Sequence, residues 1–219
     1  MTRIRGYFHR EILLYISSFY IRYCRYRGIQ YPQFDHPDIY ILPFNTVLKW
    51  TDRTREEEAL STSFAHSLGL PVPRILSYGD DGSGFGGSIW MTYISGDILS
   101  RVWKTLSDEE RSTIMGELHQ CLLRLRACHN PNGPKISSIA GTVIMSFRAC
   151  NGVIPPRIDK FDFLQYIMSP RRPEYRTDVE HNALRRLEEI PHSIVFAHGD
   201  LYRHNIIVKD GHLAGIIDW

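Results

Sequence analysis

The sequence predicts an α+β protein in which a strand-rich part comes first and a mainly helical part follows. Two short β-branched runs surround a turn at 43–45, and two more lie within 206–217. Between these regions apolar residues recur at helical spacing, most clearly over 109–128. The length of 219 residues, 43% of them hydrophobic, allows one or two domains with a stable core.

The first element expected is an amphipathic helix within residues 1–29, packed on the strands that follow. Residues 11–24 are apolar and aromatic, with arginines on both sides. Their apolar stretch of about a dozen residues is shorter than the roughly 18 that a membrane-spanning helix needs. Residues 1–34 hold six arginines and one acid, Glu11, which gives a net charge of +5. Because such a start also suits a mitochondrial presequence, targeting to mitochondria remains the alternative.

Residues 39–50 are expected to form two strands, joined by a turn at 43–45. The next helix is expected to follow Thr54, whose hydroxyl can cap it. Glutamates at 56–58 would then lie in its first turn, where acids suit the helix dipole. Gly69 is expected to end this helix.

Further along the chain, glycines at 80–87 indicate a loop, and 88–94 is expected to be a strand. Ser107 and Glu110 have the spacing of a capping box, which predicts the start of the helix over 109–128. Shorter helices are expected over 160–168 and 178–189.

Residues 206–217 predict a β-hairpin, because Asp210-Gly211 is a strong two-residue turn signal. In that hairpin Val208 would face Leu213, and Asn205 would lie opposite Ile216. Asp218 would then return to within about two residues of the level of Asn205, roughly 5 Å to the side. Amide and carboxylate oxygens placed in this way suit Mg²⁺.

His198, Asp200 and Asn205 have the spacing of the kinase catalytic loop, with Gly199 in place of the usual arginine. In that loop the aspartate accepts the proton of the attacking hydroxyl and the asparagine holds metal. A second aspartate, here Asp218, holds the metal ions that bridge the phosphates. Any one of these residues alone would suit a plain hairpin with solvated ends. Four at this spacing favour a kinase-type site.

The residues His198-Gly199-Asp200-Leu201, with Gly215-Ile216-Ile217-Asp218-Trp219, resemble the aminoglycoside phosphotransferase (APH) family, especially its fungal-type members. Segments 42–50, 58–60, 70–76 and 89–96 are also similar to that family, so the resemblance covers about 39–219. It implies a protein-kinase-like, two-lobed α+β fold. The small lobe would span 30–93, after the basic helical extension of 1–29, and the helical lobe would span 94–219. Because family members continue into helices that form much of the acceptor pocket, the C-terminal lobe is expected to be incomplete.

The resemblance further implies that the chain binds ATP and Mg²⁺. Lys49 would hold the phosphates, oriented by Glu58 or, failing that, by Glu57. No Gly-x-Gly-x-x-Gly precedes this lysine, which departs from the nucleotide loop of protein kinases. Backbone groups of the segment between the lobes would bind adenine; these residues are Thr92, Tyr93 and Ile94.

The implied reaction transfers the ATP γ-phosphate to a hydroxyl of a small molecule whose identity the sequence does not give. Asp200 would be the base, Asn205 and Asp218 would hold Mg²⁺, and His198 would brace the loop. The competing hypothesis is a truncated, non-catalytic fragment that only binds nucleotide or a partner, since positioning of the acceptor is essential for phosphoryl transfer.

Composition excludes several other classes of protein. A net charge of +2 is too small to indicate a nucleic-acid-binding protein. The cysteines form no Cys-x-x-Cys pair, which argues against a zinc site or a thioredoxin-type motif; they are Cys24, Cys121, Cys128 and Cys150. Reduced, mostly packed thiols are therefore expected, as in a cytoplasmic protein.

Overall fold

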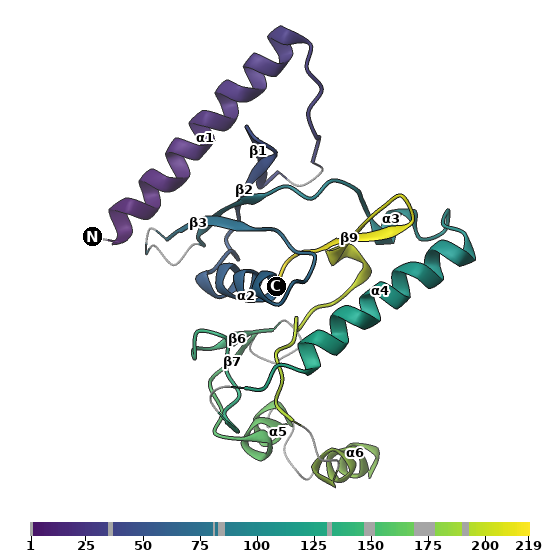
Figure 1. Ribbon diagram of the computed structural model, residues 1–219. Coiled ribbons are helices and arrows are strands. Elements are labelled where there is room, and N and C mark those ends of the chain that lie inside the picture. Colours follow the sequence, from purple (N-terminus) through teal and green to yellow (C-terminus); the bar gives the residue numbers. More distant parts are fainter. Residues whose placement is uncertain are drawn as a thin grey trace. The chain divides into compact units, whose positions relative to one another are not determined.

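The computed structural model describes residues 2–34, 37–80, 82, 86–130, 133–146, 152–168, 178–189 and 193–219 (Figure 1). The fold is mixed α+β, as the sequence predicts, and its strand pairs are antiparallel. The chain divides into two compact units. The first comprises Met1–His119 with Asp200–Trp219, and the second comprises Gln120–Gly199. The lobe boundaries expected after residues 29 and 93 stay predictions.

A four-stranded antiparallel sheet forms the centre of the first unit, in the order β1-β2-β4-β3. The turn predicted at 43–45 is confirmed, since Leu42 pairs with Thr46 across it. Phe44 and Asn45 both have positive φ angles, 60° and 56°, in this tight connection. The four strands are β1 (Ile39–Leu42), β2 (Thr46–Trp50), β3 (Ile75–Gly79) and β4 (Ser88–Thr92). Positions 81 and 83–85 of the predicted glycine loop lie outside the described residues.

Helix α1 (Thr2–Arg27) packs on this sheet along one side. Leu13 of the helix forms a buried cluster with Leu42 and Leu48. His9 fixes the helix more specifically, because its Nδ1 lies 2.7 Å from Ser88 Oγ and its Nε2 lies 2.7 Å from Ser77 Oγ. These serines belong to β4 and β3, so one imidazole links α1 to two strands.

Helix α2 (Glu56–Ser67) carries the three predicted glutamates in its first turn. The prediction that Thr54 caps this helix is wrong. Arg55 is the N-cap residue and makes no side-chain capping bond. The hydroxyl of Thr54 instead accepts a hydrogen bond from the Thr51 amide over 3.2 Å. The helix begins two residues later than Thr54, which puts that hydroxyl in the preceding turn.

A second sheet of order β5-β8-β9 contains the predicted hairpin. Its strands are β5 (Asp97–Ile98), β8 (Ile206–Lys209) and β9 (His212–Ile216). Asp210 and Gly211 have φ angles of 51° and 79°, as a two-residue turn of type I′ requires. Val208 faces Leu213 as predicted, but Ile206 rather than Asn205 faces Ile216.

The register prediction for Asn205 is therefore wrong by one residue. An irregularity between Ile207 and Val208 shifts the pairing. As a consequence the Asn205 carbonyl accepts a hydrogen bond from the Ile217 amide over 3.0 Å. Asp218 thus follows directly after the residue that pairs with Asn205.

The long predicted helix is α4 (Asp108–Arg126), preceded by the short α3 (Leu99–Val102). Its capping box is confirmed: Glu110 Oε2 accepts from the Ser107 amide over 2.8 Å, and Ser107 Oγ accepts from the Glu110 amide over 3.2 Å. The buried stripe of this helix contains Ile114, Leu118, Cys121 and Leu125.

The second unit contains β6 (Ile144–Met145), β7 (Val153–Ile154), α5 (Lys160–Met168) and α6 (Asp178–Glu189). The last two are the helices expected over 160–168 and 178–189. Isolated bridges join His129 to Val195 and Ile136 to Arg157. Among the described helices of both units, none is long and apolar enough to span a bilayer.

Candidate active site

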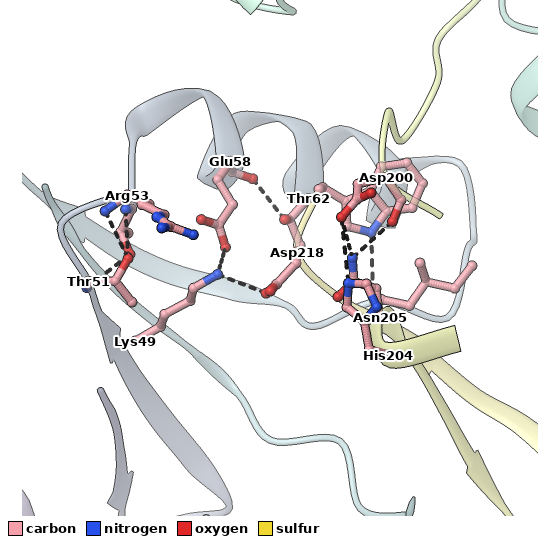
Figure 2. A network of polar contacts seen from close by, with 12 residues as sticks. Lys49, Thr51, Arg53, Glu58, Thr62, Asp200, His204, Asn205 and Asp218 are labelled. Carbon is pink, nitrogen blue, oxygen red and sulfur yellow. Dashed lines mark hydrogen bonds and ion pairs between the residues drawn. The ribbon is translucent and has the colours of Figure 1, made fainter. Parts of the chain in front are cut away.

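Five of the predicted site residues lie within the first compact unit, on elements that are far apart in sequence. Lys49 is on β2 and Glu58 is on α2. Asp200 and Asn205 lie on the loop before β8, and Asp218 follows β9. Figure 2 shows Asp218 between the Lys49–Glu58 pair and the Asp200–Asn205 loop.

A three-membered ionic network forms around the Lys49 ammonium. Nζ donates to Glu58 Oε1 and to Asp218 Oδ1, each over 2.8 Å (Figure 2). The side chains of Lys49, Glu58 and Asp218 are 12%, 16% and 48% exposed. Glu58 rather than Glu57 therefore faces the lysine, and Asp218 is a second partner that the sequence did not indicate.

The network contains more acidic than basic groups, because two carboxylates share one ammonium. Burial lowers the pKa of Lys49, but the charges of Glu58 and Asp218 outweigh this effect and raise it. Burial raises the pKa of Glu58, and the nearby ammonium opposes that change. The raised pKa keeps the lysine charged, with two carboxylates around its ammonium.

Asp218 is held in an uncommon backbone conformation, with a φ angle of 63°. The strand before it is anchored, since the Ile216 amide donates to the Pro71 carbonyl over 2.8 Å. This bond joins the end of β9 to the segment that follows α2. The Asp218 carboxylate is thereby brought to the same helix that carries Glu58.

The loop before β8 is built around the buried Asn205. Its Nδ2 donates to the Asp200 carbonyl over 2.9 Å and to Asp200 Oδ2 over 3.3 Å (Figure 2). The 3₁₀ turn η2 (Arg203–Asn205) closes the loop, with the Asn205 amide donating to the Tyr202 carbonyl over 2.9 Å. Since both side-chain bonds use the amide nitrogen, they do not consume Oδ1, the atom that can ligate a metal.

Gly199 has a φ angle of 79°, a conformation that favours glycine over the arginine of protein kinases. His198 before it is half-buried. Its role in bracing the loop stays a prediction.

His204 is a polar neighbour of Asp200 that the sequence reasoning missed. Its Nε2 lies 3.6 Å from Asp200 Oδ2, and its ring stacks on Tyr202 with centroids 5.8 Å apart. The available signal was its position between Asp200 and Asn205, in a loop already identified as functional.

The segment expected to bind adenine is already bonded to other parts of the small sheet. The Thr92 amide donates to the Arg74 carbonyl over 3.0 Å, and the Tyr93 amide donates to the Asn45 carbonyl over 2.9 Å. Asn45 Nδ2 also donates to the Tyr93 carbonyl over 3.3 Å. Adenine would therefore have to use other groups near Ile94 or displace Asn45, and this role stays a prediction.

Metal binding would rest on Asn205 and Asp218. Within the described ranges, no three His, Cys, Asp or Glu side chains gather as a metal cluster. One amide and one carboxylate nevertheless fit Mg²⁺, which usually takes one or two carboxylates and completes its shell with water and phosphate oxygens.

Comparison with solved structures shows the same fold in aminoglycoside phosphotransferases. A thermostable mutant of APH(4)-Ia in its apo form matches with a TM-score of 0.52 and 14% identity, over 83% of this chain and 61% of that one. ADP-bound APH(2'')-Ib matches with a TM-score of 0.50 and 18% identity, over 92% and 69%. This chain thus spans less than two thirds of the length of the first. A search of curated proteins found no match.

Family membership rests on a separate comparison. A model of the phosphotransferase enzyme family, APH, matches residues 39–219. That range holds Lys49, Glu58 and the loop and hairpin that carry the remaining site residues. The chain therefore belongs to the phosphotransferase enzyme family, APH.

Proposed function

We propose that this chain binds ATP and transfers its γ-phosphate to a hydroxyl of a small molecule. The observation that carries the proposal is the bonding of Lys49 to both Glu58 and Asp218. Asp218 is 169 positions from Lys49, so the fold gathers these charges from distant segments. A kinase needs this arrangement, in which a strand lysine is paired with a helix glutamate beside a metal-binding aspartate.

In this proposal Lys49 holds the ATP phosphates and Glu58 keeps its ammonium in place. Asn205 Oδ1 and the Asp218 carboxylate hold Mg²⁺, which when bound neutralises charge on the phosphates. The excess of carboxylate over ammonium favours that cation. The lysine can then leave Asp218 for the phosphates, because Glu58 remains as its partner.

Asp200 is the proposed base. Its side chain is exposed, and Asn205 holds one carboxylate oxygen by a 3.3 Å bond. An acceptor hydroxyl can therefore approach the carboxylate and lose its proton there. The protein's contribution is positioning and charge stabilisation, since phosphoryl transfer demands little covalent chemistry from side chains.

The acceptor is proposed to be a small hydroxyl-bearing molecule. Two solved structures of the same fold are aminoglycoside phosphotransferases, one of them bound to ADP. These relatives support the proposal that the chain binds a nucleotide and a small acceptor. They do not define the acceptor, because substrate identity differs widely within one fold.

Isothermal titration calorimetry of the protein with ATP tests the nucleotide and metal parts of the proposal. We expect binding in the presence of Mg²⁺ and a large loss of affinity in chelator, because the phosphates would then face Asp218 without a counter-ion. Lys49→Met should also abolish binding, whereas the exposed Lys104→Met should not. Equal affinity with and without Mg²⁺, or unchanged binding by Lys49→Met, would contradict the proposed site.

A further inference from the structure

We propose that the outer face of α1 binds an anionic membrane surface. Large apolar side chains line that face, here called the aromatic stripe; they are Phe8, Ile12, Tyr15, Phe19, Tyr23 and Tyr26. Phe19, Tyr15 and Tyr26 are 66%, 75% and 88% exposed. A contiguous exposed apolar strip of this kind marks a surface that contacts a partner.

The aromatic stripe is separate from the face that α1 uses for its own packing. The stripe residues recur every three or four positions, which places them on one side of a helix. Other positions of α1 face the protein and are buried, among them Leu13, Ser17 and Cys24. The helix thus has two apolar faces, and among the described residues only the second packs on the sheet.

Charge on the helix identifies the kind of partner. Arg5, Arg22, Arg25 and Arg27 are exposed on α1. Glu11, the only acid of the helix, is paired with Arg10 over 3.0 Å. Two copies that met through this same face would bring like charges together, so the complementary surface is anionic.

Length and composition favour a lipid surface over an acidic protein. From Phe8 to Tyr26 the stripe runs for about 27 Å at 1.5 Å per residue, straight along one helix. Tyrosine and phenylalanine flanked by arginine are the residues of helices that lie in the plane of a membrane interface. No described helix spans a bilayer, so α1 would lie on the surface.

Vesicle co-sedimentation of the whole chain tests this proposal. We expect binding to phosphatidylcholine vesicles containing about one third phosphatidylserine to be at least about tenfold tighter than to pure phosphatidylcholine. About 0.5 M salt should weaken the binding, because it screens the arginines. Absence of binding to the anionic vesicles would overturn the proposal and leave an acidic protein as the occupant of the face.

Matched variants locate the contact. Phe8→Ser with Phe19→Ser should lower the affinity for anionic vesicles about tenfold or more. Phe161→Ser on α5 should leave it unchanged, although Phe161 is 57% exposed and Phe8 is 55% exposed. Equal loss in both variants would contradict a specific role of α1. Circular dichroism checks that each variant is folded.

A charge pair completes the test. Arg22→Gln with Arg25→Gln should weaken binding to anionic vesicles about tenfold. Lys104→Gln with Lys135→Gln removes the same net charge from exposed positions elsewhere and should have little effect. If both pairs weaken binding equally, attraction depends on net charge alone and the assignment to α1 is wrong.

Discussion

At the scale of single residues, Lys49 is the most consequential side chain of the candidate site, because two carboxylates depend on it. Lys49→Met would leave the largely buried Glu58 without its counter-ion. We expect a loss of about 1–3 kcal/mol in the free energy of unfolding, measured with urea. Adding Glu58→Gln should recover part of this loss, since the buried charge is then gone. A double variant whose loss equals the sum of the two single losses would show that the pair is not coupled.

Asp200 should matter for chemistry and little for binding. Asp200→Asn keeps the backbone carbonyl that accepts from Asn205 over 2.9 Å, so the loop should persist. We expect unchanged Mg²⁺–ATP affinity by calorimetry, but a loss of about 10²–10⁴-fold in phosphate transfer to an acceptor or to water. Asp210→Asn is the matched control, because Asn tolerates the left-handed conformation of that turn. Full phosphate transfer by Asp200→Asn would refute its role as base.

At the scale of elements, the attachment of α1 to the sheet should depend on pH through His9. Burial lowers the pKa of His9 below its ordinary 6.5, so the folded protein binds this proton less readily than the unfolded chain. The contribution of neutral His9 to the free energy of unfolding is therefore complete above pH 6.5. It is lost as the pH falls from 6.5 through the lower pKa that His9 has in the folded protein. Thermal unfolding between pH 8 and about pH 5 should show this loss.

The matched variant for this pH effect is His9→Gln, whose amide can both donate to one serine and accept from the other. The wild-type protein should lose more stability than His9→Gln over the same pH range. Identical pH profiles for the two proteins would exclude His9 as the source of the effect.

The same attachment requires a glycine on β3. A Cβ at Gly79 would lie 2.7 Å from the His9 ring, closer than real Cβ contacts, so Gly79→Ala should displace α1. We expect destabilisation of about 1–3 kcal/mol by urea unfolding, as for overpacking in a core. Gly116→Ala is the control, because nothing lies within 4 Å of its Cβ position in α4. That change should stabilise by about 0.5–1 kcal/mol, since alanine is the better helix former. Equal changes in stability for Gly79→Ala and Gly116→Ala would contradict the close contact between Gly79 and His9.

For the whole molecule, the sequence predicted the parts that follow local rules. The hairpin at Asp210-Gly211 and the capping box at Ser107 depend on residues a few positions apart, and both were found. The hairpin register failed at Asn205, because the pairing shifts between Ile207 and Val208. The available sign was Gly215, opposite Ile207, since an isolated glycine within a strand often marks a bulge. The Lys49–Asp218 contact was also missed, since it joins segments 169 positions apart and depends on where β9 ends in the folded chain. Local chemistry was readable from the sequence, whereas long-range geometry was not.

The last prediction concerns where nucleotide stabilises the molecule. The residues proposed for phosphate, metal and base all belong to the first compact unit. Saturating Mg²⁺–ATP should therefore slow amide hydrogen exchange in β2, α2 and the β8–β9 hairpin. At a ligand concentration 100 times the Kd, the free energy of opening of these amides should rise by up to about 2.7 kcal/mol. Helix α6 of the other unit holds none of the proposed ligand groups and should exchange at its unliganded rate. Protection confined to α6, with β2 and β8–β9 unchanged, would show that ATP binds elsewhere and that the Lys49 network is only structural.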